Sequence, residues 1–162
     1  DALIKDADFI KIDTQGYEYE VLKGCEGILG SVLAVLSECW SVEIHKRQKL
    51  VYKVMEKLDK SGYELTGIEK GNWKHKYSNL FPISSGVPVW MELLFFKKLD
   101  NLEKNSRKKI LKLIFLYALY GYYGKSYSLA LDIGIDIKEE LKQFQSPKFF
   151  PFIKPFIPKL HN

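Results

Sequence analysis

The sequence predicts an α/β fold in which parallel strands with crossover helices end in an antiparallel edge pair, followed by an α-helical extension. Three observations support this fold class. Apolar runs of strand length alternate with segments whose apolar residues recur about every 3.6 positions. The last two strand-like runs have no clear helix between them, and the composition changes after Leu99 to one that is helical and basic.

Length and composition limit the class of protein. The 162 residues are enough for one domain or for one part of a larger one, and 46% hydrophobic with 28% charged residues is typical of a globular protein. Two cysteines, Cys25 and Cys39, are too few for a disulfide framework and lack zinc-site spacing, which favours a cytoplasmic setting. No apolar run is long enough to cross a bilayer. The chain opens at Asp1, so we expect a fragment of a longer protein or a processed chain.

The first predicted strand is Asp8–Ile12. A helix is expected next, because the apolar residues between Val21 and Leu29 share one side at helical spacing. Val32–Leu36 is then a continuous apolar run, which is typical of a strand buried on both faces of a parallel sheet.

A second helix is predicted over Gln48–Lys60, and Gly62 follows where a helix-ending glycine belongs. Tyr63–Ile68 and Val89–Phe96 are the last two predicted strands. The order of these elements implies a parallel sheet that ends in an antiparallel pair. Glu69–Pro88 is then a long polar and aromatic loop, a kind that is usually a functional lid or disordered.

Residues 1–99 are predicted to form the α/β part and residues 100–162 a helical extension. Helices are expected over Lys108–Tyr123, over Ser126–Gly134 and from Asp136 onward. Asp136 and Glu139, three residues later, form a pattern like a capping box at the start of the third helix. A tail rich in proline and phenylalanine follows. Residues 103–162 contain 11 basic and 5 acidic residues, so the net charge of +5 lies entirely in this part. Such a part can meet a protein partner or an anionic surface, or can simply be a solvated face.

Candidate site residues follow the first strand. In open α/β sheets, ligands bind beyond the carboxyl ends of the strands, and Asp13 lies at that position. Its carboxylate could orient a hydroxyl or take its proton, or only cap the next turn. Gln15 offers a donor and an acceptor, and Gly16 allows a close approach or a positive φ. Glu18 is either a site residue or a favourable charge in the first turn of a helix.

Further candidates follow the second strand. Glu38 comes after the buried run with only Ser37 between them, so it is expected at the same sheet edge as Asp13. Trp40 could wall a pocket or pack in the core, and His45 could be a general base or a solvated side chain. The aromatic and basic stretch 73–77 could close over a sugar, but no nucleic-acid motif accompanies it, so nucleic acid is not an expected partner. A metal site would need ligands from distant segments, and none is expected.

Residues 11–24, KIDTQGYEYEVLKG, closely resemble the FkbM family of methyltransferases. In that family a strand ends in Lys-Ile/Val-Asp, followed by a Glu-or-Gln/Gly pair, a Glu and Val-Leu-x-Gly. The resemblance implies a Rossmann-like sheet that closes with an antiparallel hairpin, S-adenosyl-L-methionine as cofactor, and O-methylation of a small molecule or sugar. The predicted site then has Asp13 and Glu38 as catalytic residues and Asp13 and Gln15 as cofactor contacts. The predicted substrate contacts are Gln15, Gly16, Glu18, Trp40 and His45.

One part of the family pattern is missing. The family places its cofactor on an N-terminal half with a first strand, a glycine-rich loop and an acidic residue, whereas Gly24, Gly27 and Gly30 here fall within or at the end of a predicted helix. We therefore expect the C-terminal half of a methyltransferase, inactive on its own. The alternative is a non-catalytic module that docks a partner or an anionic surface through its C-terminal helices. A dehydrogenase is disfavoured, because nothing resembles a nicotinamide site.

Overall fold

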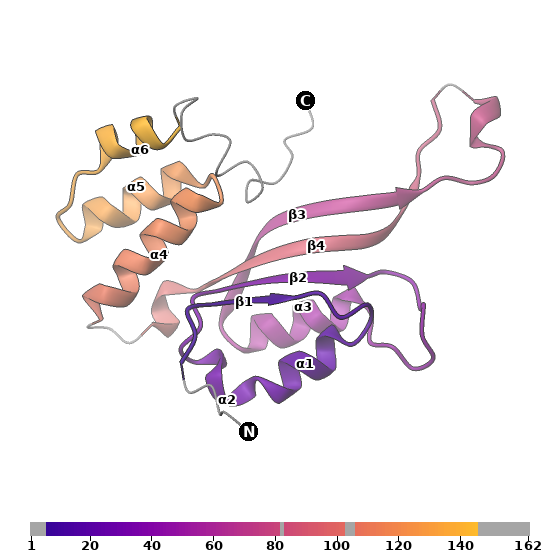
Figure 1. Ribbon diagram of the computed structural model, residues 1–162, viewed down its shortest axis with the longest axis horizontal. Helices are drawn as coiled ribbons and strands as arrows, with labels where there is room; N and C mark the ends of the chain where they lie inside the picture. Colours follow the sequence, from indigo (N-terminus) through magenta and orange to yellow (C-terminus); the bar gives the residue numbers. More distant parts are fainter. Residues whose placement is uncertain (1–5, 82, 103–105, 146–162) are drawn as a thin grey trace. The chain divides into compact units, whose positions relative to one another are not determined.

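The computed structural model describes residues 6–81, 83–102 and 106–145. The chain divides into two compact units, Asp1–Asn101 and Leu102–Asn162. The first unit is a mixed α/β structure built on one sheet, and the second is helical (Figure 1).

The sheet of the first unit has four strands within the described residues, in the order β1-β2-β4-β3. They are β1 (Phe9–Ile12), β2 (Ala34–Trp40), β3 (Tyr63–Trp73) and β4 (Val87–Lys97). β1 and β2 are parallel, whereas β4 runs antiparallel to both β2 and β3. The predicted parallel start and the predicted antiparallel edge pair are both confirmed.

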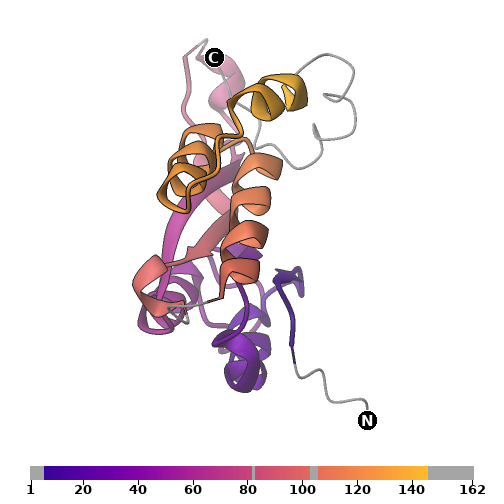
Figure 2. The same cartoon turned by 90° about the vertical axis from the view of Figure 1, so that its left-hand side faces the viewer.

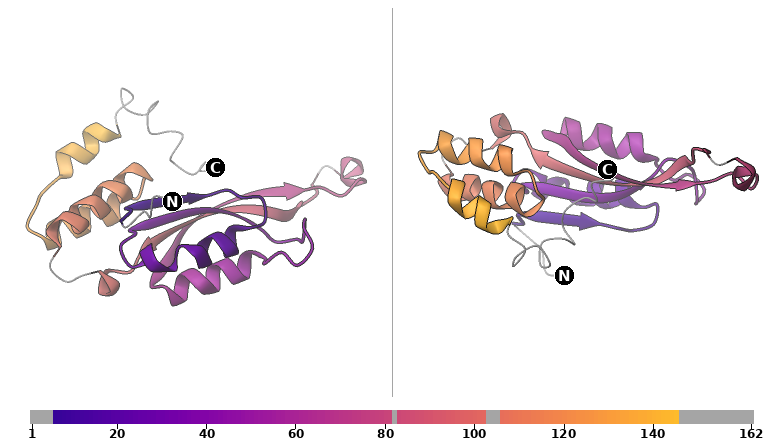
Figure 3. Two further views of the ribbon diagram at one scale, coloured as in Figure 1. Left: turned by 60° about the horizontal axis from the view of Figure 1, so that its bottom comes forward. Right: turned by 90° about the horizontal axis from the view of Figure 1, so that it is seen from above.

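Three helices cover one face of this sheet: α1 (Glu18–Gly24), α2 (Glu26–Leu29) and α3 (Val51–Lys60) (Figure 3). The single helix predicted through Leu29 is wrong, because the chain leaves helical geometry at Cys25, where ψ is 1°. The core lies between this sheet face and the helices. It includes Leu22, Leu29, Val35, Cys39, Val54, Leu58, Leu93 and Phe95.

A buried lysine joins two helix ends to the sheet. The Nζ of Lys97, which is 4% exposed, donates to the carbonyl oxygens of Leu29 at 3.0 Å and of Ser61 at 2.8 Å. These carbonyls end α2 and cap α3, and a cation is favoured at the C-terminal end of a helix. The same Nζ lies 4.4 Å from the ring centroid of Tyr63. Lys97 therefore stabilises the packing of the helices on the sheet.

The loop predicted between the last two strands, Glu69–Pro88, is longer than the one in the structure. β3 continues to Trp73 and β4 begins at Val87, so the connection is residues 74–86, with one 3₁₀ turn at Ser78–Leu80. The resulting hairpin extends beyond the ends of β1 and β2 (Figure 1). The reason is antiparallel pairing that a propensity pattern does not show, since residues 69–73 of β3 pair with residues 87–92 of β4. A Cβ on Gly71 would lie 2.1 Å from the ring of Trp90. Glycine therefore fits inside this strand although it usually weakens one.

The second unit contains α4 (Arg107–Leu119), α5 (Tyr123–Asp132) and α6 (Lys138–Phe144) (Figure 2). The three predicted helices are confirmed with shifted ends. α4 and α5 are joined by a buried hydrogen bond from the Oγ of Ser126 to the carbonyl of Ile114, at 2.9 Å. The tail predicted to be rich in proline and phenylalanine lies outside the described residues. In the described ranges, no helix has both the length and the apolar character needed to span a membrane.

Candidate active site

Glu18 organises the turn that follows β1. Its side chain is buried, and its Oε1 accepts hydrogen bonds from the N–H of Gly16 at 2.8 Å and from both the N–H and the hydroxyl of Thr14 at 3.2 Å. A buried donor that keeps its acceptor avoids the cost of an unsatisfied polar group. Glu18 therefore fixes the conformation of the turn, and its predicted contact with a substrate stays a prediction.

Gln15 joins two carboxylates across the sheet edge. Its backbone has a φ of 53°, a left-handed conformation that is uncommon for a residue with a Cβ. Its Nε2 donates to the Oδ1 of Asp13 at 3.0 Å and to the Oε1 of Glu38 at 2.9 Å. Asp13 follows β1 directly and Glu38 lies near the end of the adjacent parallel strand β2. The structure thus brings together Asp13, Gln15 and Glu38.

Gly16 allows the segment after β2 to approach this turn. Its φ is 108°, and a Cβ on it would lie 2.8 Å from the Cδ of Gln48. The Oε1 of Gln48 in turn accepts from the N–H groups of Ile44 at 2.9 Å and His45 at 3.2 Å. Gln48 therefore shapes the segment that carries His45 while lying against the turn.

The side chain of His45 is exposed, and its ring centroid lies 6.2 Å from that of Tyr17. Within the described residues, its ring makes no hydrogen bond to Asp13 or Glu38. The structure therefore places His45 at the rim of the turn, and its role as a substrate contact or base stays a prediction.

Two further carboxylates extend the site along the sheet. Glu92 of β4 is in register with Glu38 of β2 on one side and with Glu69 of β3 on the other, so the three side chains share one face. The Nζ of Lys11 lies 3.9 Å from the Oε1 of Glu92. Sequence reasoning missed this row, although a lone carboxylate in the apolar strand VWMELLFF was a usable signal. No cluster suited to a metal ion occurs among the described His, Cys, Asp and Glu residues.

The environment changes the acidity of two members of this row. Burial raises the pKa of Glu38, and the neighbouring charge of Asp13 raises it further, while the hydrogen bond from Gln15 opposes the shift. Burial also raises the pKa of Glu92, opposed by the charge of Lys11. A carboxylate with a raised pKa is a better proton acceptor close to neutral pH. Glu38 and Glu92 are therefore suited to accept a proton.

An aromatic pair lies next to the carboxylates on the same face. Trp40 is in register with Trp90 and stands two residues from Glu38 along β2. Cys39 lies between Glu38 and Trp40 in sequence and points into the core. Because side chains alternate along a strand, Trp40 is on the sheet face opposite to α1, α2 and α3. The Nε1 of Trp40 is buried and has no hydrogen-bond partner within the described ranges. Trp40 therefore lies on the sheet face that carries the carboxylates, and its role as a wall of a pocket stays a prediction.

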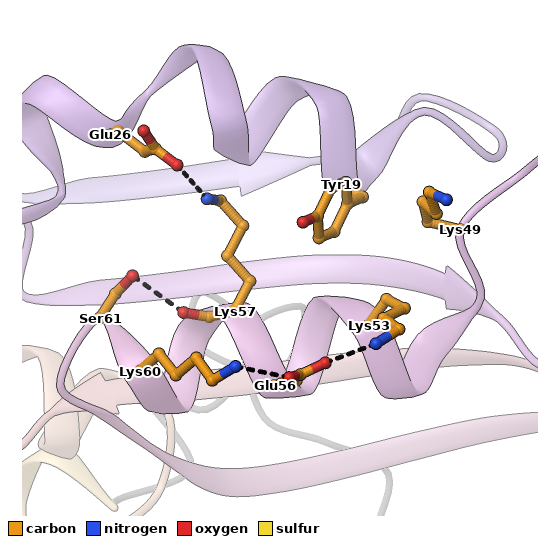
Figure 4. Close-up of a pocket in the computed structure, with 8 residues that line it drawn as sticks. All are labelled: Tyr19, Glu26, Lys49, Lys53, Glu56, Lys57, Lys60 and Ser61. Atoms are coloured by element: carbon orange, nitrogen blue, oxygen red, sulfur yellow. Dashed lines mark hydrogen bonds and ion pairs between the residues drawn. The ribbon is translucent and has the colours of Figure 1, made fainter.

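A groove of about 550 Å³ lies on the other side of the unit, between α1, α2 and α3 (Figure 4). Three of its lysines are paired with its glutamates: Lys57 with Glu26, and both Lys53 and Lys60 with Glu56, at 2.8 Å and 2.6 Å. Figure 4 shows that the Lys57–Glu26 pair joins α3 to α2, whereas both pairs of Glu56 lie along α3. The groove contains none of the predicted site residues, and its internal pairing is typical of a salt-bridged surface.

Comparison with known proteins adds one finding. Residues 1–65 match the family model described as the methyltransferase FkbM domain. No curated protein and no solved structure is significantly similar to the chain. The matched range contains every predicted site residue. The predicted resemblance is therefore confirmed: residues 1–65 are similar to the methyltransferase FkbM domain.

Proposed function

We propose that the turn after β1 and the carboxylate row form the acceptor side of an S-adenosylmethionine-dependent methyltransferase that acts on a hydroxyl of a small molecule or sugar. The observation that carries this proposal is the bridge from Gln15 to both Asp13 and Glu38. It lies at the carboxyl ends of two parallel strands, where α/β sheets bind ligands. It also falls within the segment that matches the methyltransferase family.

In the proposed reaction, the acceptor oxygen forms a bond to the methyl carbon while the sulfur–methyl bond of the donor breaks, and the hydroxyl proton passes to a carboxylate. Asp13 is exposed and can orient the hydroxyl by accepting its hydrogen bond. Glu38 accepts the proton in this proposal, because its pKa is raised. Gln15 holds both carboxylates in place, and Trp40 and Trp90 offer apolar surface to the ring of a sugar or similar acceptor.

The described residues suit only part of the cofactor. Carboxylates at the sheet edge fit the positive charge of a sulfonium group, and Lys11 is the basic group that lies among them. When bound, the cofactor supplies an activated methyl group. Within the described ranges there is no glycine-rich turn between a strand and a helix to hold its nucleoside. We therefore propose that a further segment, outside residues 6–145, supplies that half of the pocket.

The parallel pair β1–β2 and the antiparallel pair β3–β4 support this division of the pocket between two segments. β1 is the terminal strand of the sheet order, so a parallel sheet of the Rossmann-like type would continue on its outer side. The cytoplasmic location expected from the cysteine content stays a prediction.

The test uses the longest natural protein that contains this chain. Calorimetry should show binding of S-adenosylmethionine, and transfer of labelled methyl to hydroxyl compounds should fall at least about a hundredfold in Asp13→Asn and Glu38→Gln. Glu20→Gln, an exposed carboxylate in the first turn of α1, is the matched control and should leave transfer unchanged. Absence of cofactor binding would remove the basis of the enzyme proposal. Full activity in both site variants would remove these residues from the mechanism.

The alternative of a docking module has one supporting observation. Leu111 and Phe115, one helical turn apart on α4, are 43% and 57% exposed. An apolar strip of this kind can contact a protein partner. Leu111→Ser with Phe115→Ser should then abolish that interaction and leave methyl transfer intact, whereas an unchanged interaction would contradict the alternative.

A further inference from the structure

The end of the β3–β4 hairpin carries a cluster of exposed apolar side chains. We call residues 73–81 together with 83–87 the hairpin tip. Leu80, Phe81 and Ile83 are 72%, 63% and 97% exposed, and Trp73 and Tyr77 are also more than half exposed. Apolar side chains gathered at such exposure mark an interaction surface more often than scattered ones do.

The charge around the hairpin tip is of one sign. Lys70, Lys74 and Lys76 flank the apolar residues, and the sequence has no aspartate or glutamate between Glu69 and Glu92. All three lysines are exposed. The hairpin tip is therefore an apolar end with a positive rim, which complements an anionic surface.

Local hydrogen bonds hold the apolar side chains in this position. The N–H of Ser78 donates to the carbonyl of His75 at 2.8 Å, and that of Phe81 donates to the carbonyl of Ser78 at 3.1 Å. The Nζ of Lys76 lies 4.7 Å from the ring centroid of Tyr77. These contacts order residues 75–81 of the hairpin tip, which lowers the entropy that binding has to offset there.

The strand register fixes where the hairpin tip lies in the first unit. β4 starts beside the end of β2, with Trp90 opposite Trp40, so the hairpin projects from the sheet end that also carries Asp13 and Glu38. Figure 1 shows this projection beyond β1 and β2.

We propose that the hairpin tip docks the protein on an anionic lipid surface. Leu80, Phe81 and Ile83 enter the boundary between headgroups and acyl chains, and the lysines contact anionic headgroups. Trp73 and Tyr77 lie behind them, and these two residue types are enriched at that level of a membrane. A narrow projecting end with uniform positive charge fits a lipid layer better than a folded partner, which would need a matching cavity. This inference does not depend on the proposed methyl transfer.

The test is sedimentation of the protein with vesicles of phosphatidylcholine alone and of phosphatidylcholine with 30% phosphatidylserine. Binding is expected to the anionic vesicles and to weaken with salt. Lys74→Ser and Lys76→Ser should each lower the partition coefficient about fivefold. Lys46→Ser combined with Lys49→Ser is the charge-matched control, since both lysines are exposed elsewhere in the unit. This control should change binding less than Lys74→Ser combined with Lys76→Ser does.

The apolar part is tested by Leu80→Ser with Phe81→Ser, which should reduce binding at least about tenfold. The matched variant is Leu111→Ser with Phe115→Ser on α4, which should bind like the wild type. Circular dichroism of each variant checks that the fold is kept. Three results would overturn the proposal: no binding to anionic vesicles at millimolar lipid, loss of binding in the α4 variant alone, or a dimer in sedimentation equilibrium that the hairpin tip variant dissociates without any lipid binding.

Discussion

Replacing Glu18 by alanine tests whether this residue supports the turn of the candidate site. The substitution leaves three donors without their acceptor: the buried N–H of Gly16 and the two partly buried donors of Thr14. A buried donor left unsatisfied costs about 1–3 kcal/mol, and each partly buried donor costs less because water can reach it. The free energy of unfolding of the first unit should therefore fall by about 2–4 kcal/mol. Glu18→Gln keeps an acceptor oxygen and should cost less than alanine does.

Urea denaturation followed by tryptophan fluorescence measures this loss directly. All three tryptophans, at positions 40, 73 and 90, lie in the Asp1–Asn101 unit, so the signal reports the unfolding of that unit. With an m-value of roughly 1.5 kcal/mol/M, the midpoint should fall by about 2 M. Glu20→Ala is the control, because it removes a carboxylate from the same helical turn but from an exposed position. Equal midpoints for Glu18→Ala and Glu20→Ala would refute a supporting role for Glu18.

Three further predictions also use tryptophan fluorescence, two of them through urea denaturation and one through the emission spectrum of the native protein. Gly16→Ala should destabilise the unit by about 2 kcal/mol, because alanine is strained at a φ of 108° and its Cβ meets a side chain. Gly27→Ala is the control and should not destabilise the unit, because its Cβ has open space around it. Equal effects of the two substitutions would contradict this prediction. Burial raises the folded pKa of Glu92 above its ordinary 4.5, so the stability linked to its protonation is present below pH 4.5 and is lost as the pH rises through the folded pKa. Glu92→Gln, which cannot ionise, should raise the urea midpoint at pH 7 by an amount that shrinks as the pH falls toward 4.5, and a gain that does not depend on pH would rule out this cause. Gly71→Ala should displace the ring of Trp90 and shift the native emission spectrum, and an unchanged spectrum would show that the strand absorbs the Cβ.

The proximity of Asp13 and Glu38 could be predicted from the sequence, because one rule about parallel strands was sufficient. Each carboxylate follows an apolar run, and the carboxyl ends of parallel strands share a sheet edge. The glutamates in β3 and β4 needed more information, since their alignment with Glu38 depends on the register of antiparallel strands. A one-residue slip would move every side chain to the other face, and no local pattern fixes that register.

The turn shows a different limit. A glutamate in the first turn of a helix is explained by the helix dipole alone, so its sequence position did not reveal that Glu18 is buried and accepts three hydrogen bonds. Nor does the sequence show that Gln15, as well as the glycine after it, takes a positive φ while its side chain reaches two carboxylates. A non-glycine residue in this conformation needs support from its surroundings. Here Glu18 supplies that support through the N–H of Gly16, so the buried glutamate and the strained glutamine act as one unit. The positions of the two carboxylates at the sheet edge therefore depend on a side chain that touches neither of them.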